Sequence, residues 1–248
     1  MTEQQIEHDR CEALNNDEYA TYWQKGFLVM RGVLDEQDIR ALREECDRLA
    51  LLTDRFDTLV EPRKSLDGSV IRERLEALSD LSPVFHELIC DERLLAPVRQ
   101  LFQAGACLFK DKINFRPPGT TGFRLHQDYA GFAFVGVPAA DIVTIMIAID
   151  PVTKASGALE VFPGYHHEIL PEPANDPRAA DPGSVDLSVG ELVELEPCDI
   201  CAFHSLVPHR SSPNISDGSR RTAFLTYNHA RHGDCYRSYY AGREDVYR

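Results

Sequence analysis

The chain has 248 residues, of which 43% are hydrophobic and 27% are charged. This length suits one large β-rich or α/β domain, and the ordinary apolar content excludes an intrinsically disordered chain. Acidic residues outnumber Lys and Arg by 40 to 26, and the resulting net charge of −14 disfavours nucleic acid and anionic membrane surfaces as partners.

The first third of the chain is predicted to be largely helical. A helix is expected over residues 16–26, where Asn and Asp favour its start and Gly26 favours its end. A short strand is expected over 27–30, and Asp35, with Asp38 three residues later, predicts the capped start of a second helix. A third helix is expected over 82–102, with Pro83 in its first turn.

Short β-type segments follow one another after about residue 105, separated by turn residues. They cover residues 108–115, 142–149, 159–162, 192–195, 200–203 and 222–227. Consecutive strands without helices between them indicate an antiparallel sandwich or barrel, so the fold class is mainly β with N-terminal helices (α+β). We expect a single domain over 1–248, with a helical layer over 1–104, a β core over 105–230 and an exposed insertion over 171–188, a candidate lid.

Cellular location is predicted from what the sequence lacks. No apolar run approaches the ~20 residues of a membrane span. Residues 1–7 show neither the basic start nor the apolar stretch of a signal peptide. The seven cysteines are scattered and odd in number, which indicates reduced thiols in a cytoplasmic protein.

One motif has the residue types and spacing of a metal site. On a strand, His126 and Asp128 would point to the same face, because side chains alternate with a period of two. A third ligand would come from His209 at the end of a later strand, with His204 as the competing choice. Two histidines and one carboxylate leave open positions on an iron(II) ion, the arrangement of non-haem iron oxygenases.

An arginine stands at a fixed distance from this third ligand. Arg220 follows His209 by eleven residues and opens a predicted strand. A buried guanidinium can bind the far carboxylate of a 2-oxo acid that chelates the metal at its other end. Arg221 is adjacent, and alternation allows only one of the two to point inward; the spacing favours Arg220.

Several motifs in the same order resemble the phytanoyl-CoA dioxygenase (PhyH) family of iron(II)- and 2-oxoglutarate-dependent oxygenases. They are His126-Gln127-Asp128, Ser156-Gly157-Ala158-Leu159, Pro163-Gly164-Tyr165-His166, Phe203-His204-Ser205 and His209-Arg210-Ser211. The resemblance covers about residues 17–230. It implies a double-stranded β-helix (jelly-roll or cupin-like) core and a hydroxylase that uses dioxygen and releases succinate and CO₂.

The resemblance also implies roles for individual residues. His126, Asp128 and His209 would bind iron(II), and Arg220 would bind the distal carboxylate of 2-oxoglutarate, the cosubstrate. The remaining implied cosubstrate positions are Ser211, Asn114 and Thr144.

The substrate is expected to be a small acid, either a small phosphonate or a natural-product intermediate. Lys110, Lys112 and Asn114 share one face of a predicted strand, which would either line the pocket or face solvent. Arg72 is a second candidate for the substrate, although Arg72 and Arg74 also fit a solvated helix start. Tyr129 would border the substrate or cover the metal.

Other functions are compatible with the same residues. A zinc hydrolase or isomerase could use the three ligands without Arg220, and a 2-oxoglutarate sensor could keep the site without turnover. The histidines 166, 167, 229 and 232 are interpreted as surface residues. The sequence makes no prediction of oligomeric state.

Overall fold

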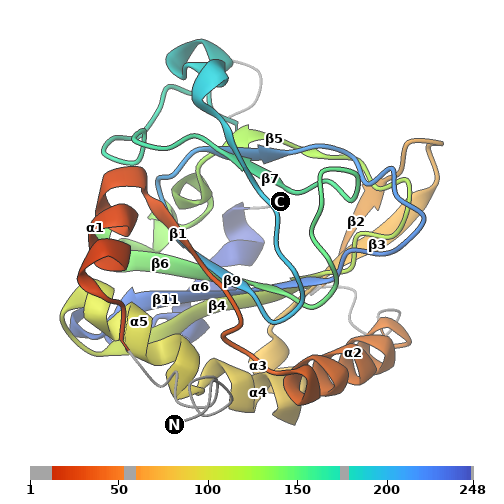
Figure 1. Cartoon of the computed structure of the whole chain (residues 1–248), viewed down its shortest axis with the longest axis horizontal. Coiled ribbons are helices and arrows are strands. Elements are labelled where there is room, and N and C mark those ends of the chain that lie inside the picture. Colours follow the sequence, from red (N-terminus) through yellow and green to blue (C-terminus); the bar gives the residue numbers. More distant parts are fainter. Residues whose placement is uncertain (1–12, 53–59, 174–178, 247–248) are drawn as a thin grey trace, which may run out of the picture.

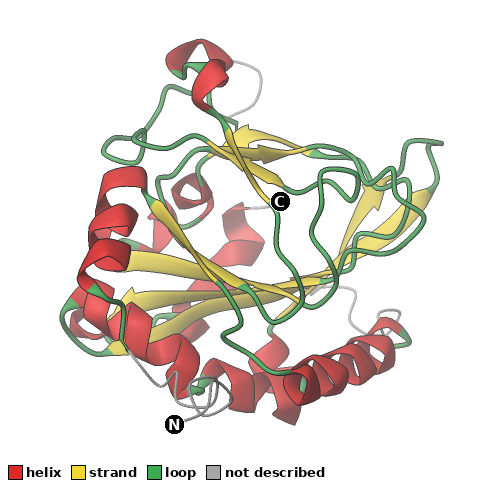
Figure 2. Ribbon diagram, viewed as in Figure 1, coloured by secondary structure: helices red, strands yellow, loops and turns green. Residues whose placement is uncertain are grey.

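The computed structural model describes residues 13–52, 60–173 and 179–246. Two antiparallel sheets face each other, and most of the N-terminal helices lie on the outer side of the larger one (Figures 1 and 2). This arrangement confirms the predicted mainly β fold with a double-stranded β-helix core. The segment of residues 1–7 lies outside the described residues.

The larger sheet has seven strands in the order β1-β9-β6-β11-β4-β3-β2. Their bounds are β1 Phe27–Met30, β2 Val60–Lys64, β3 Val70–Glu76, β4 Ala106–Asn114, β6 Ile142–Ala148, β9 Ile200–His204 and β11 Thr222–His229. The smaller sheet has the order β5-β10-β7-β8, with β5 Phe123–His126, β7 Leu159–Val161, β8 Glu191–Val193 and β10 His209–Ser211. Every predicted strand is present with its ends shifted by a few residues.

The helices are α1 Asn16–Lys25, α2 Glu36–Ala50, α3 Leu78–Leu81, α4 Pro83–Ile89, α5 Glu92–Phe102 and α6 Tyr236–Val246. The capping box at Asp35 and Asp38 is present, as predicted. The single helix expected over 82–102 is wrong: Asp91 has an extended backbone and its side chain accepts from the Arg93 N–H, so it ends α4 and caps α5. None of the helices in the described ranges is long and apolar enough to cross a membrane.

The alternation of side chains along the large sheet separates two environments. Outward-facing residues such as Ile113, Ile145 and Leu225 pack against the helices in the main apolar core. Inward-facing residues lie between the sheets, and they are apolar around Met146 and Phe203 but polar along β3 and β4. The functional site lies at this polar end of the interior.

Two expectations for the organisation of the chain need correction. The first 104 residues are more than a helical layer, because β1 and the β2–β3 hairpin supply both edges of the large sheet. The segment 171–188 is only partly exposed, because Ala180 and Val185 are buried with Leu125 and Phe162. Residues 174–178 of that segment lie outside the described part of the chain.

Candidate metal and cosubstrate site

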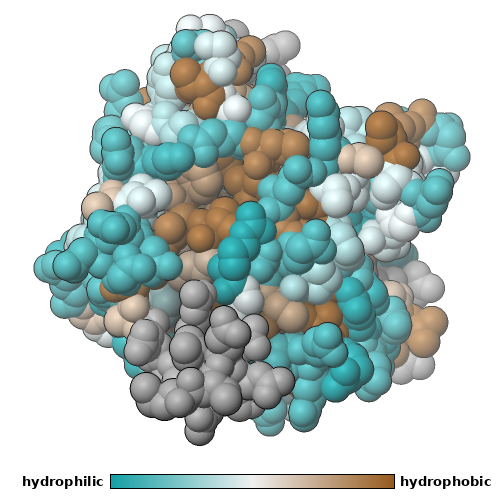
Figure 3. All heavy atoms as spheres, viewed as in Figure 1, coloured by the Kyte–Doolittle hydropathy of each residue, from teal (hydrophilic) through white to brown (hydrophobic). Residues whose placement is uncertain are grey.

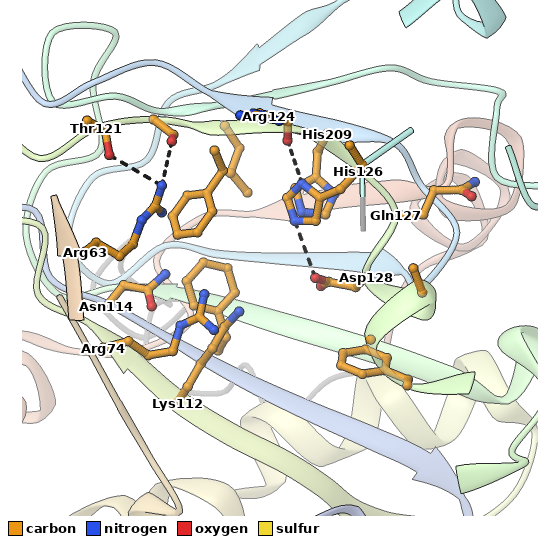
Figure 4. Close-up of a pocket in the computed structure, with 18 of the residues that line it drawn as sticks. Arg63, Arg74, Lys112, Asn114, Thr121, Arg124, His126, Gln127, Asp128 and His209 are labelled. Carbon is orange, nitrogen blue, oxygen red and sulfur yellow. Dashed lines mark hydrogen bonds and ion pairs between the residues drawn. The ribbon is translucent and has the colours of Figure 1, made fainter. Parts of the chain in front are cut away.

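Three predicted metal ligands come together at one end of the small sheet. His126 ends β5 and is the direct cross-strand partner of His209, which begins β10. Asp128 lies on a short 3₁₀ turn after β5, so the expectation that it shares the strand with His126 is wrong. One possible ligand atom from each residue lies within 4.8 Å of the others, and Figure 4 shows the three side chains converging on one side of the cavity.

Hydrogen bonds fix the orientation of both imidazoles. His126 donates through Nδ1 to the Arg124 carbonyl at 2.8 Å, and His209 donates through Nδ1 to the Val207 carbonyl at 3.0 Å. Each ring therefore presents Nε2 as its free ligand atom. Gln127, between the ligands, bonds the carbonyl of Leu206 at 2.6 Å and so holds this segment against the loop before β10.

The protonation of these groups suits a divalent cation. Burial and the neighbouring His209 lower the pKa of His126 to about 4, so its imidazole is neutral at pH 7. Burial opposes ionisation of Asp128, but Lys112 and the other neighbouring basic groups together outweigh it, and the carboxyl pKa falls to about 2. A neutral imidazole and an ionised carboxylate are the forms that bind metal.

A buried arginine lies within the same cavity. Arg220 is 1% exposed and donates through Nη1 to the Gly157 carbonyl, while its Nε has no hydrogen-bond partner among the described residues. Arg221 points the other way and pairs with Asp150 and Asp47, each at 2.7 Å. Of the two adjacent arginines, the structure therefore places Arg220 inward.

Ser211 is a buried neighbour of Arg116 and is not among the residues that line the cavity. Its Oγ accepts from Arg116 Nη1 at 3.1 Å and from the Phe123 N–H at 3.1 Å. The backbone is tightly packed here: a Cβ on Gly157, whose φ is +80°, would lie 2.4 Å from the Ser212 carbonyl oxygen. This close packing holds the carbonyl of Gly157 against Arg220.

The cavity between the sheets has a volume of about 530 Å³. Lys110, Lys112 and Asn114 line it, so their strand face is not a solvated one. Arg63 and Arg74, from the β2–β3 hairpin, extend into it from one side (Figure 4). Further lining residues include Phe123, Phe132, Leu159 and Phe224.

Besides Ser211, three candidate residues do not line this cavity. Thr144 is buried and its hydroxyl bonds that of Thr226 at 3.0 Å. Arg72 is exposed farther out along β3, which is a strand rather than a helix start; Arg74, two residues on, takes the inward position instead. Tyr129 packs against the aromatic cluster that contains Phe132.

The other histidines lie apart from the ligand group. His204, the competing third ligand, is buried; its Nδ1 accepts from the Leu206 N–H, and its ring lies against Trp23. The surface prediction for His166 is wrong, because it is 3% exposed and its Nε2 bonds the Trp23 carbonyl at 3.2 Å. His167 is exposed, and His229 and His232 are partly exposed.

Sequence reasoning missed the ionic residues behind the cavity wall. Glu73 lies 3.3 Å from Arg63 and 3.7 Å from Arg116, and Glu76 lies 3.3 Å from Lys110. Residues 70–76 do not alternate between charged and apolar side chains, so the sequence carries no clear signal for the strand that holds both glutamates.

Comparison with known proteins agrees with this geometry. The model of the family described as Phytanoyl-CoA dioxygenase (PhyH) matches residues 22–222. A 2-aminoethylphosphonate dioxygenase from an uncultured bacterium is 30% identical over 93% of this chain and 88% of its own, and a methylphosphonate hydroxylase from Gimesia maris is 27% identical over 89% and 83%. The crystal structure of EctD from S. alaskensis with 2-oxoglutarate and 5-hydroxyectoine has the same fold, with a TM-score of 0.78, 20% identity and coverage of 89% of this chain and 78% of EctD.

Proposed function

Since the chain belongs to the phytanoyl-CoA dioxygenase family and is a dioxygenase, we propose that His126, Asp128 and His209 hold its iron(II). The observation that carries this proposal is the convergence of two Nε2 atoms and one carboxylate within 4.8 Å. Two imidazoles and one carboxylate leave room for a chelating 2-oxo acid and dioxygen. The whole chain, residues 1–248, would act as one catalytic domain.

Iron(II) with 2-oxoglutarate and dioxygen supplies the oxidation: one oxygen atom enters a substrate C–H bond as hydroxyl, the other enters succinate, and CO₂ is released. The chain positions the reactants. Arg220, whose Nε has no hydrogen-bond partner among the described residues, would bind the distal carboxylate of 2-oxoglutarate, with Ser211 as the further proposed contact. Asn114 lines the same cavity and would contact the cosubstrate.

The substrate that the cavity supports is a small acid. Lys110, Lys112 and Arg74 bring positive charge to the interior of a protein whose net charge is −14. An anion is then attracted by the cavity although the chain as a whole is acidic. A small phosphonate agrees with two relatives by name, and a natural-product intermediate with an acid group would satisfy the same charges.

A cytoplasmic location accompanies this function. The six cysteines of the described ranges are free thiols, and Cys46, Cys201 and Cys235 are buried. Such thiols persist where the surroundings are reducing. The proposal is tested by locating the tagged full chain in cell fractions; recovery outside the cytoplasm would contradict it.

The site assignment is tested by anaerobic titration of the protein with iron(II) and 2-oxoglutarate. We expect the visible charge-transfer band of a chelated 2-oxo acid in the wild type and its loss in Asp128→Ala. Arg220→Ala should need about 100-fold more 2-oxoglutarate, because a buried partner of a carboxylate is removed. Arg221→Ala is the matched control, since that neighbouring side chain pairs with Asp150 outside the cavity.

Two outcomes would replace the proposal. Absence of the band together with retained zinc would favour a hydrolase or isomerase on the same ligands. A band without succinate formation, over a panel of phosphonates, amino acids and acyl-CoAs, would favour a 2-oxoglutarate sensor.

A further inference from the structure

Positive side chains dominate the cavity wall. Six of them line it: Arg63, Arg74, Lys110, Lys112, Arg124 and Arg220. Among the described lining residues the only carboxylate is Asp128, which is a proposed metal ligand. A substrate therefore meets cations from several strands and no acidic side chain that is free to pair with a positive group.

The carboxylates behind the wall are already shared between several cations. Glu76 lies 3.3 Å from Lys110, 3.5 Å from Arg74 and 3.1 Å from Arg243. Glu76 is fully buried, and although burial opposes its ionisation, the surrounding cations lower its carboxyl pKa to about 2. It is therefore a fixed negative charge that neutralises one of its three partners.

The second shared carboxylate is Glu73, which lies 3.3 Å from Arg63 and 3.7 Å from Arg116. Glu73 and Arg116 are both 1% exposed or less, so water screens this pair weakly. Arg74, Arg124 and Arg243 make further contacts. Even without these three, five positive groups face the three carboxylates of Asp128, Glu73 and Glu76; they are Arg63, Lys110, Lys112, Arg116 and Arg220. The excess is positive.

Lys112 shows where this excess is least compensated. No described carboxylate lies within ion-pair distance of its Nζ, which stands 4.7 Å from the centre of the Phe224 ring. Burial and the neighbouring Arg74 lower the pKa of Lys112 to about 7. An ammonium group in this position is stabilised when an anion binds next to it.

Binding of the proposed iron(II) and 2-oxoglutarate leaves the excess of positive charge at the cavity unchanged. Iron(II) carries two positive charges and 2-oxoglutarate carries two negative ones, so together they add no net charge. We infer that the substrate itself is a small molecule with at least two acid groups and no ammonium group. This inference rests on the proposed function, and it distinguishes the chain from its relative that is named for 2-aminoethylphosphonate.

Three phosphonates of similar shape test this inference: 3-phosphonopropionate, ethylphosphonate and 2-aminoethylphosphonate, whose second group is a carboxylate, nothing and an ammonium. Each is titrated anaerobically into the full chain loaded with iron(II) and 2-oxoglutarate, and its affinity is taken from the shift of the charge-transfer band and from calorimetry. We expect 3-phosphonopropionate to bind at least about tenfold more tightly than 2-aminoethylphosphonate, because like charges within one cavity repel. Ethylphosphonate should fall between them.

Equal or tighter binding of 2-aminoethylphosphonate would overturn the inference while leaving the oxygenase assignment intact. Failure of the charge-transfer band to form before any phosphonate is added would instead contradict the proposed function. Lys112→Met should reduce the preference for 3-phosphonopropionate by about tenfold. Lys154→Met, a change at an exposed lysine away from the cavity, should leave it unaltered.

Discussion

At the scale of single residues, Arg116 connects the two elements that are proposed to hold the cosubstrate. Its side chain is fully buried and donates to the Ser211 hydroxyl at 3.1 Å and to the Ser212 carbonyl at 2.8 Å. Its own carbonyl accepts from the Arg220 N–H at 3.1 Å. One residue thus fixes both Ser211 and the start of the strand that follows Arg220.

We therefore predict that Arg116→Met weakens 2-oxoglutarate binding about tenfold or more, because two buried hydrogen bonds from a charged donor are lost. Arg116→Lys should restore little of this affinity, since an ammonium group lacks the planar fork that reaches both acceptors. The measurement is the anaerobic titration of the charge-transfer band, with the Michaelis constant for the substrate determined alongside.

The matched control is Arg210→Met. Arg210 lies between His209 and Ser211 in sequence, but its side chain pairs with Glu160 at 2.6 Å on the other side of the strand. A lower melting temperature for Arg116→Met with unaltered 2-oxoglutarate affinity would assign Arg116 a purely structural role.

Residues whose role depends on local spacing were predictable, and residues placed by distant contacts were not. His126 and Asp128 are two positions apart and Arg220 comes just before β11, and all three line the cavity as expected. The sequence predicts Arg72 rather than Arg74 as a substrate contact, because it does not show where along β3 the cavity begins. His166 followed a Pro-Gly turn, yet α1 and its Trp23 cover it.

At the scale of whole elements, α6 closes the side of the large sheet next to β4. The Tyr236 and Tyr240 hydroxyls lie 3.2 Å and 3.1 Å from Asp111 Oδ1, and Asp111 also accepts from the Leu78 and Ser79 N–H groups. On the opposite face of β4, Lys110 Nζ lies 2.5 Å from the Tyr239 hydroxyl. The helix thereby supports a strand that lines the cavity.

Removing one of these hydroxyls should loosen α6. We predict that Tyr240→Phe lowers the free energy of unfolding by about 1.5–3 kcal/mol, because the hydroxyl bonds a buried carboxylate. Urea denaturation measures the change, and faster hydrogen exchange should appear in α6 and β4. Tyr165→Phe is the control, since the Tyr165 hydroxyl contacts the N–H of Asp186 in an exposed loop; an equal loss in both variants would contradict this role of α6.

The elements that were missed have weak periodic signals. β2 contains Pro62, Arg63 and Lys64, and it forms because it pairs with β3 rather than because of its own propensity. α6 is rich in Tyr and Arg, and its buried face depends on hydroxyl contacts that hydropathy does not record. The strands of the β core, by contrast, are apolar on both faces or alternate clearly, so their positions followed from composition.

At the scale of the whole molecule, charge is divided between surface and interior. The chain carries a net charge of −14, yet positive side chains are concentrated along the cavity. Hydrophilic residues cover much of the face shown in Figure 3. The described carboxylates near the cavity are too few to balance its cations. Because cations are buried next to one another at this site, they destabilise the folded chain.

The pKa of Lys112 shows how this destabilisation depends on pH. Its pKa in the folded chain is lowered to about 7 from the ordinary 10.5, so the unfolded state binds a proton that the folded state holds weakly. Between these two values the destabilisation grows as the pH falls, and it is complete below about pH 7. Above about pH 10.5 the lysine is neutral in both states and contributes nothing.

Lys112→Met should consequently stabilise the substrate-free protein while it weakens anion binding. We expect a gain of about 1–3 kcal/mol in the free energy of unfolding at pH 7, reduced from the full effect of the pKa because Lys112 is only partly buried. The gain should shrink as the pH is raised toward 10, and saturating 3-phosphonopropionate at pH 7 should reduce it, because the anion stabilises the protonated wild type more than the variant. Urea denaturation at pH 7 and 9.5 measures both effects, with Lys154→Met as the control. If Lys112→Met were less stable than the wild type at pH 7, the packing of the Lys112 side chain, rather than its charge, would decide the stability of this wall.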